Sequence, residues 1–313
     1  MAKQMTEEES EAQWLEVISQ MKELTGPSLS QICGNLDKTT GEYIGTGTLI
    51  SIHNGLYLIT AQHVAAEMFK EGNSGKQYPL GLSHSIGNGN LVLNIQNPWT
   101  AWASPVDVAA TRIPTDGLEG NVVSVSARHF ALHTQSLEDD LYFVHGYPGV
   151  RSRFTAFEGR GVVSTSLPYG GWLCDSGWSE FDPKMHFAIT FPPDKLVDEQ
   201  RTSTSLPHPG GMSGSLVWKS NRLRSGAGWS PNDARIVGLA QRYDQDKQCL
   251  VVTRAEYVKG LLVQLLRSEY AYFRWIKRGR PSDDSLDDWV AAEFSIPNLL
   301  SDDGHQSQHF DLG

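Results

Sequence analysis

Residues 45–63, GTGTLISIHNGLYLITAQH, contain the pattern that decides how the chain folds. Two apolar runs rich in β-branched residues flank Asn54 and Gly55, a dipeptide that favours a two-residue turn of type I′. The stretch therefore predicts a β-hairpin. His63 follows the second run in a helical turn of small residues, so a titratable side chain comes soon after a strand.

The same pattern of residue types continues on both sides of this hairpin, from about residue 28 to residue 258. Short β-branched and aromatic runs alternate with Gly, Asn, Pro and Asp, which is typical of an all-β barrel or sandwich. The number of runs exceeds what one small barrel needs, which favours two barrels. Further strand candidates are LVLNI (91–95), NVVSVSA (121–127), LYFVHGY (141–147), GRGVVSTS (159–166), HFAITF (186–191), GSLVW (214–218), ARIVGLAQRY (234–243) and QCLVVTRA (248–255).

The two ends of the chain have a helical period instead. Residues 7–24 and 255–276 each place apolar side chains on one face, and acids occupy the first turns of the earlier segment, where the helix dipole favours them. Gly26 and Pro27 end that segment. The two apolar faces consist of Trp14, Leu15, Ile18 and Met21, and of Tyr257, Leu261, Leu262 and Leu265.

Beyond Arg280 the chain holds many acids and no Lys or Arg. Such a composition is typical of a solvated or partner-binding tail. Four apolar residues offer a way to dock one short segment of it, namely Trp289, Phe294, Ile296 and Leu299.

Composition limits the classes of function. The 313 residues are 39% hydrophobic and 20% charged, and their formal net charge is −10, which disfavours nucleic acid or an acidic membrane surface as a partner. The acidic start lacks a secretory pattern, and no segment is apolar for the eighteen or so residues that a membrane helix requires. Cys33, Cys174 and Cys249 form no paired motif. We expect a cytoplasmic protein with reduced thiols and no metal or cofactor.

A second stretch, HPGGMSGSLVW (208–218), places Ser213 among glycines just before an apolar strand. A nucleophilic serine has to stand clear of its backbone, and a turn without side chains lets amide N–H groups point at a developing oxyanion. The amides of Gly211 and Ser213 are the candidate donors. Taken alone, a glycine–serine–glycine pattern is common in a chain so rich in both residues.

A serine nucleophile needs a base within hydrogen-bond reach and a carboxylate that orients the base. Of the ten histidines, His63 is the one that follows an apolar strand and lies among small residues. In SPVDVAATRI (104–113), Asp107 begins a short apolar strand, where a carboxylate is costly unless it is paired. Considered separately, His63 could be a packing or surface residue, and Asp107 a turn aspartate.

Together, TAQH (60–63), DVA (107–109) and GMSGS (211–215) resemble the motifs of trypsin/chymotrypsin-like serine peptidases, the PA clan, in the order His, Asp, Ser. The interval 107 − 63 = 44 residues is similar to that in the family. HGYPG (145–149) adds to the resemblance, which covers about residues 40–255. The chain lacks the disulfides of the secreted members.

The resemblance implies two antiparallel barrels of six strands each, at about residues 28–130 and 135–260, with the active site between them. It assigns Ser213 as the nucleophile, His63 as the general base and Asp107 as the orienting carboxylate, with the amides of Gly211 and Ser213 as the oxyanion hole. The implied units are an N-terminal extension (1–27), a peptidase domain (28–265), and a C-terminal helix with an acidic tail (266–313).

The same resemblance makes the strand IVGLAQ (236–241) the edge on which substrate adds as a β-strand. Gly238, Leu239 and Ala240 are then candidate substrate-binding residues, and Gly238 leaves room for a substrate side chain. A glycine in a strand bulge is an equally good interpretation of Gly238. His208 is a further candidate for the pocket, although a histidine in a surface loop is the more common case.

Two residues depart from the family pattern. Met212 occupies the position where digestive members have an aspartate that pairs with a newly cut N-terminal amine. We therefore expect no activation by trimming, and an oxyanion hole that is preformed or ordered by a partner or the chain's own helices. Pro207 stands where an acid sets specificity for Lys or Arg, so basic specificity is not assigned.

The sequence thus predicts a serine endopeptidase acting on proteins or peptides through an acyl-enzyme. The terminal helices and the acidic tail are expected to control access or to bind a regulatory partner. A catalytically silent protein that uses the peptidase fold for binding remains the alternative. An ester hydrolase of the α/β type is disfavoured, because GMSGS does not match its GxSxG turn and the order of the three residues differs.

Overall fold

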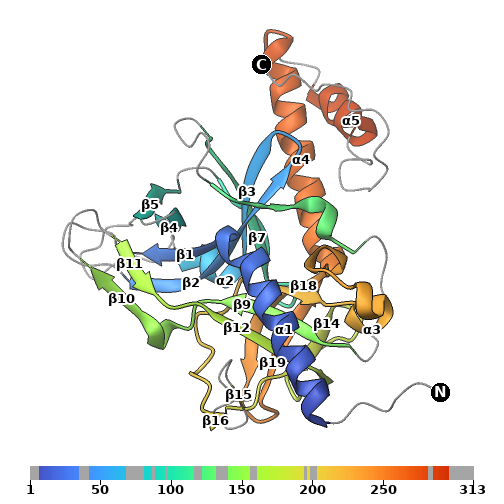
Figure 1. Ribbon diagram of the computed structural model, residues 1–313. Helices are drawn as coiled ribbons and strands as arrows, with labels where there is room; N and C mark the ends of the chain where they lie inside the picture. Colours follow the sequence, from blue (N-terminus) through green and yellow to red (C-terminus); the bar gives the residue numbers. More distant parts are fainter. Residues whose placement is uncertain are drawn as a thin grey trace.

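The computed structural model describes residues 7–34, 42–67, 81–86, 89–95, 98–115, 122–131, 140–155, 161–193, 196–197, 203–280 and 285–295. It is built mainly from two large β-sheets, with helices near the two ends of the chain (Figure 1).

The first sheet has eight strands in the order β5-β4-β1-β2-β3-β7-β6, and β8 pairs with β2. All of its pairs are antiparallel except β2 with β8. Its strands are β1 (Leu29–Gly34), β2 (Glu42–Ile52), β3 (Gly55–Thr60), β4 (Gly81–Ile86), β5 (Gly89–Asn94), β6 (Thr100–Trp102), β7 (Val108–Ile113) and β8 (Val125–Ser126).

The second sheet has seven antiparallel strands in the order β12-β9-β17-β18-β19-β14-β13. They are β9 (Tyr142–Gly146), β12 (Leu167–Gly171), β13 (Leu173–Cys174), β14 (His186–Thr190), β17 (Leu216–Lys219), β18 (Arg235–Asp244) and β19 (Cys249–Arg254). Two further pairs stand apart from the large sheets, β10 (Ser152–Thr155) with β11 (Gly161–Ser164), and β15 (Leu196–Val197) with β16 (Ser203–Thr204).

The prediction of a mostly β protein with terminal helices is confirmed. The sheets hold eight and seven strands, so the two closed barrels of six strands and the domain boundaries stay predictions. The hairpin of the opening stretch forms, but its turn lies one residue earlier than predicted. Ile52 pairs with Gly55, which leaves His53 and Asn54 in the turn, and His53 adopts a φ of +50°.

The α-helices are α1 (Glu7–Thr25), α2 (Gln62–Ala66), α3 (Arg222–Ser225), α4 (Ala255–Lys277) and α5 (Ser285–Ser295). Short 3-10 turns are η1 (Gly26–Ser28), η3 (Ala127–His129), η4 (Gly149–Arg151), η5 (Gly226–Gly228) and η6 (Pro231–Asp233).

The N-terminal helix α1 packs on the second sheet, against β9 and β12. Met21, from its predicted apolar face, is fully buried, and Val17 is buried with it. At the end of α1, Thr25 Oγ1 bonds His145 Nδ1 at 2.8 Å. Burial lowers the pKa of His145 to about 3, so this buried histidine is neutral near pH 7.

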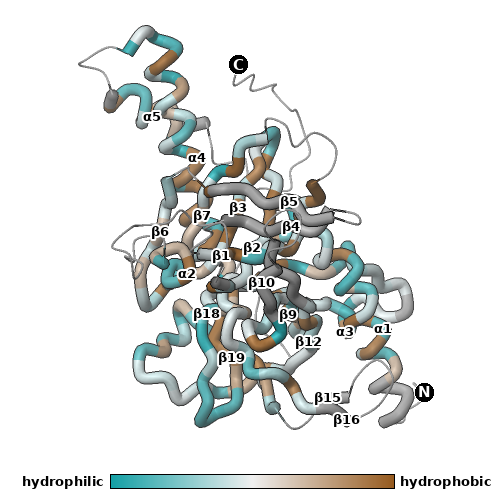
Figure 2. The backbone as a smooth tube through the Cα atoms, turned by 90° about the vertical axis from the view of Figure 1, so that its left-hand side faces the viewer, coloured by the Kyte–Doolittle hydropathy of each residue, from teal (hydrophilic) through white to brown (hydrophobic). Residues whose placement is uncertain are grey.

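The C-terminal helix α4 packs against strands of both sheets, and its C-terminal end extends beyond them (Figure 1). Hydrophobic and hydrophilic segments alternate along α4 and α5, as an amphipathic pair requires (Figure 2). Asp288 of α5 is buried and accepts hydrogen bonds from Arg274 and Arg278 at 3.0 and 3.1 Å. The tail segment thus docks through Asp288, whereas Trp289 is 41% exposed. Ile296 and Leu299 lie outside the described residues.

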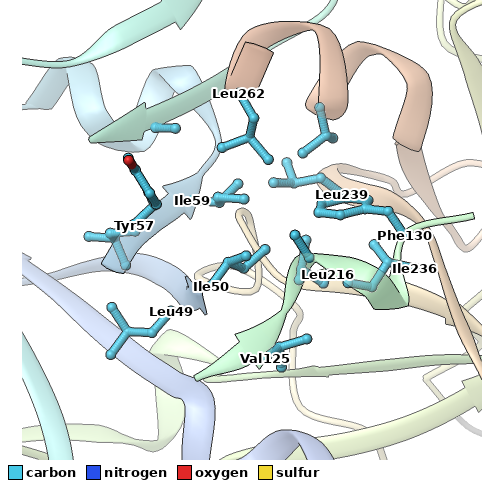
Figure 3. Close-up of a cluster of buried hydrophobic side chains, with 14 of the residues drawn as sticks. Leu49, Ile50, Tyr57, Ile59, Val125, Phe130, Leu216, Ile236, Leu239 and Leu262 are labelled. Atoms are coloured by element: carbon cyan, nitrogen blue, oxygen red, sulfur yellow. The ribbon is translucent and has the colours of Figure 1, made fainter. Parts of the chain in front are cut away.

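A single hydrophobic cluster joins the two sheets. Leu262 of α4 lies close to Ile59 of the first sheet and Leu239 of the second (Figure 3). Burying such aliphatic side chains together is the main favourable term in folding. Because each sheet contributes to the same core, their relative position is determined by packing as well as by hydrogen bonds.

Replacing Leu262 with Ala should therefore lower the free energy of unfolding by about 2–5 kcal/mol, because it leaves a cavity among fully buried neighbours. The matched control is Leu223→Ala, at a leucine that is 60% exposed in α3, which should change stability by less than about 0.5 kcal/mol. Urea unfolding followed by tryptophan fluorescence measures both. Equal effects of the two substitutions would contradict the shared core.

Candidate active site

His63 and Asp107 form a hydrogen-bonded pair at one end of the first sheet. His63 Nδ1 lies 2.7 Å from Asp107 Oδ2, and the His63 backbone N–H donates to Asp107 Oδ1 at 2.9 Å. Because an ionised carboxylate only accepts, the imidazole donates through Nδ1–H and keeps Nε2 as its acceptor. Asp107 is buried, whereas the His63 side chain is 51% exposed. The imidazole is therefore accessible to solvent, while the carboxylate that it contacts is buried.

The loop that carries Asp107 is held by the second sheet. Thr253 Oγ1 donates to the Val106 carbonyl at 2.6 Å. The Pro105 carbonyl accepts from Gln241 Nε2 at 3.3 Å and from His186 Nε2 at 2.8 Å. Burial lowers the pKa of His186, and its other ring nitrogen accepts from a backbone amide, so its neutral form makes both bonds. Side chains of the second sheet therefore position a carboxylate that belongs to the first.

Ser213 lies in the second of two consecutive turns. Met212 N donates to Pro209 O at 2.9 Å, and Ser215 N donates to Met212 O at 3.0 Å. The third residue of each turn is a glycine with positive φ, +96° at Gly211 and +93° at Gly214, as type II turns require. Met212 is fully buried in the second hydrophobic cluster. An apolar anchor thus holds the residue that precedes Ser213.

The turn that carries Ser213 docks directly on the first sheet. The Thr46 amide donates to the Ser213 carbonyl at 3.0 Å, and Thr60 Oγ1 donates to the Thr46 carbonyl at 2.7 Å. Gly214 packs so closely that a Cβ there would collide with the Thr46 carbonyl and the Thr60 side chain. Thr60 ends β3, three residues before His63. The docking brings the serine turn to the end of the strand that leads to the histidine.

The Ser213 hydroxyl points toward the second sheet, where it donates to the Gln241 carbonyl of β18 at 3.0 Å. Between the described side chains of Ser213 and His63 there is no hydrogen bond. The structure thus joins two of the three predicted catalytic residues directly. The third lies in a turn docked beside them, with its hydroxyl engaged elsewhere.

The backbone around Gly211 is held from both sides. The Gly211 carbonyl accepts from Tyr43 Oη at 2.6 Å and from Thr46 Oγ1 at 2.9 Å. The Gly210 carbonyl accepts from the Gly149 amide at 2.6 Å. In a trans peptide the N–H points opposite to the C=O, so the Gly211 amide points away from Gly149. Neither that amide nor the Ser213 amide donates to any described residue. Two backbone donors close to the serine are therefore uncommitted.

A pocket of about 230 Å³ opens beside Ser213. Of the predicted substrate-binding residues, His208 and Ala240 line it. Leu239 is buried in the first hydrophobic cluster, and Gly238 packs against β19 and Phe187, so neither reaches the pocket. The lining residues are His208, Pro209, Gly210, Met212, Ser213, Ala240, Arg242, Tyr243, Gln245 and Leu250.

Tyr43, His186, Gln241 and Arg242 were not identified from the sequence. The side chains of Tyr43, His186 and Gln241 donate hydrogen bonds to backbone carbonyls of distant segments. Every residue has such a carbonyl, so the sequence does not indicate which residue accepts the bond. The register of β18 is irregular between Ala240 and Arg242, where Ala240 pairs with Val252 and Arg242 with the adjacent Val251. A bulge of this kind breaks the alternation of side chains along a strand.

Within the described ranges, no group of three or more His, Cys, Asp or Glu is arranged to bind a metal ion. No helix among these residues is long and apolar enough to cross a membrane. All three cysteines are free, and burial raises the pKa of Cys33 to about 12.

Comparisons with known proteins add limited information. A family model described as "Protein of unknown function (DUF2934)" matches residues 268–296, which include the end of α4 and all of α5. No curated protein matches the chain.

Three solved structures illustrate the similarity in fold. One is the crystal structure of Deg5, with a TM-score of 0.45 and 14% identity over 82% of this chain and 94% of that chain. Another is the HtrA-type protease AlgW with a tripeptide, with a TM-score of 0.44 and 13% identity. That match covers 78% of this chain and 61% of that chain. The third comes from work on the Sesbania mosaic virus VPg protein, with a TM-score of 0.41 and 15% identity. That match covers 74% of this chain and 87% of that chain. All three TM-scores lie below 0.5.

The close packing of Gly214 can be tested by Gly214→Ala. The new side chain has to adopt a positive φ and also collides with Thr46 and Thr60, so we expect stability to fall by about 2–5 kcal/mol. Gly279→Ala is the matched control, because Gly279 also has a positive φ (+83°) but faces open space. It should cost about 1–2 kcal/mol. Urea unfolding of both variants measures the difference, and equal costs would show that the turn is not docked against β2.

Proposed function

We propose that the chain is a serine endopeptidase in which Ser213 is the nucleophile, His63 the general base and Asp107 the carboxylate that orients the base. The observation that carries the proposal is the pairing of a buried Asp107 with a half-exposed His63, next to the docked turn that holds Ser213. The motif resemblance assigns the same three residues. The assignment of the oxyanion hole to Gly211 and Ser213 belongs to the same proposal.

In the proposed mechanism, the Ser213 hydroxyl leaves Gln241, gives its proton to His63 Nε2 and attacks the scissile carbonyl carbon. The negative charge that develops on the carbonyl oxygen is stabilised by the amides of Gly211 and Ser213. His63 then returns the proton to the leaving amine, the C–N bond breaks, and an ester on Ser213 remains. Water, deprotonated by His63, hydrolyses this ester and restores the hydroxyl.

The surroundings of the turn support an oxyanion hole that needs no ion pair. Two hydroxyl groups hold the Gly211 carbonyl, a backbone amide holds the Gly210 carbonyl, and Met212 is anchored in the core. These contacts come from β2, from Gly149 and from the second hydrophobic cluster, and none of them involves the N-terminus of the chain. Activation by trimming to a new N-terminus is therefore unnecessary in this account.

The bond from Ser213 to Gln241 suggests how the expected regulation would act. The hydroxyl must rotate away from β18 before it can reach an imidazole, so the activity depends on the population of the rotated state. A partner that binds the terminal helices or the acidic tail and favours this state would raise turnover. The three free cysteines suit the reducing conditions of a cytoplasmic protein.

The same bond favours the alternative function, a catalytically silent protein that binds peptides. A serine that remains on Gln241 would leave His63 without a proton to accept. The two functions differ in the reactivity of Ser213 and share the pocket, so a reagent that modifies activated serines distinguishes them.

An alkyl fluorophosphonate should label the wild-type protein, and Ser213→Ala should abolish the labelling. His63→Ala should slow labelling by at least about 10³-fold, and Asp107→Asn by a similar factor, because the asparagine favours the wrong tautomer of the imidazole. Intact-mass spectrometry measures the rates. The wild type should also cleave peptides in an unbiased library, with Ser213→Ala as the control.

Circular dichroism should verify that each variant is folded. If the folded wild type neither reacts nor cleaves, the endopeptidase proposal is wrong and the binding function is favoured. A normal labelling rate for Asp107→Asn would remove Asp107 from the site.

A further inference from the structure

The pocket beside Ser213 has an unusual charge. Its polar lining comprises Arg242, His208, Gln245 and the serine itself, and none of the Asp or Glu residues that the structure describes lines it. The rest of the lining is apolar or aromatic, with Met212, Leu250 and Tyr243 as the largest side chains. An arginine thus lines an otherwise largely apolar pocket in a protein whose net charge is −10.

Arg242 is held in place without a carboxylate partner. Its guanidinium carbon lies 4.5 Å from the centroid of the Trp178 ring, a stacking contact typical of arginine. The structure shows no ion pair for Arg242 with any described acidic side chain. The nearest acid along the strand, Asp244, instead accepts from Ser176 Oγ at 2.9 Å and from the Gly177 amide at 2.7 Å.

The platform under Arg242 is connected to the proposed catalytic residues. The Trp178 amide donates to Ser176 Oγ at 3.2 Å. The Trp178 ring packs against the His186 ring, with 5.2 Å between the two ring centroids. His186 in turn bonds the Pro105 carbonyl in the loop that carries Asp107. The guanidinium is therefore positioned relative to the site by a chain of contacts, which reduces the entropy lost when it binds an anion.

We propose that this pocket selects an acidic side chain, glutamate or aspartate, on the substrate residue whose carbonyl Ser213 attacks, and that Arg242 pairs with its carboxylate. The proposal rests on the proposed function for the attack itself, but the binding of the side chain does not require catalysis. The methylene groups of glutamate fit the apolar lining, and its carboxylate pairs with the Arg242 guanidinium, which has no ion pair with a described acidic side chain. A lysine or arginine side chain finds only like charge.

The first experiment measures binding without turnover. Fluorescent peptides that differ only in a C-terminal Glu or Gln are titrated against the Ser213→Ala variant, and anisotropy gives the dissociation constants. We expect Glu to bind about tenfold more tightly than Gln, since a charge-assisted hydrogen bond replaces a neutral one. Arg242→Gln in the same background should abolish this difference.

The second experiment measures cleavage by the otherwise wild-type protein. Internally quenched peptides carry Glu, Asp, Gln, Leu or Lys at the residue before the scissile bond. The kcat/KM for Glu should exceed that for Gln and Leu by about tenfold. Arg242→Glu should reverse the order in favour of Lys. Arg254→Gln is the matched control, because Arg254 also stacks on an aromatic ring of the second sheet, Phe187, but does not line the pocket. It should keep the preference for Glu.

The outcomes separate the two proposals. Equal binding of Glu and Gln peptides, or a higher kcat/KM for Leu than for Glu, would overturn the selection of an acidic side chain while leaving the endopeptidase intact if cleavage depends on Ser213. A preference for Glu that survives in Arg242→Gln would overturn the role of Arg242. A Glu preference in binding without any cleavage or labelling would support the pocket and contradict the enzyme.

Discussion

The arrangement of the site depends on the contact between Thr46 of the first sheet and the serine turn of the second. One residue supplies both bonds, since its amide donates to the Ser213 carbonyl and its hydroxyl donates to the Gly211 carbonyl. The absence of a side chain at Gly214 permits the close approach. Without this contact, the separation of His63 and Ser213 would depend on apolar packing and on the bonds that hold the loop of Asp107. Backbone bonds between sheets are short and directional, so they position a turn more exactly than apolar packing alone.

Apolar packing and α4 keep the two sheets together so that this contact can form. The main hydrophobic cluster draws on both sheets and on α4. Polar contacts also hold α4 on the first sheet. Glu269 of α4 accepts a hydrogen bond from Tyr57 of β3 at 2.9 Å and forms an ion pair with Arg112 of β7 at 3.4 Å. Those two strands lead to His63 and from Asp107 respectively. The same helix continues into the α4–α5 pair, which places the segment that matches a family of unknown function on the element that braces the site.

Much of the fold was predictable from the sequence, because alternating apolar runs and helical periods are local signals. The β-rich body, the hairpin before His63 and the two terminal helices follow from such patterns. The strand-edge hypothesis for Gly238 and Leu239 stays a prediction, and the pocket beside Ser213 is lined farther along β18 by Ala240, Arg242 and Tyr243. The side chains of Tyr43, His186 and Gln241 donate to carbonyls of segments far away in the chain, so only the folded structure brings them to notice. The orientation of the Ser213 hydroxyl has no signal in the sequence at all.

The central claim is that Ser213, His63 and the two free amides act on one reacting group. A crystal structure of the protein after reaction with diisopropyl fluorophosphate tests it most directly. The account predicts phosphorus bonded to Ser213 Oγ, a phosphoryl oxygen within hydrogen-bond distance of the Gly211 and Ser213 amides, and His63 Nε2 beside the ester oxygen. An adduct on another residue, or one whose phosphoryl oxygen turns away from both amides, would contradict it.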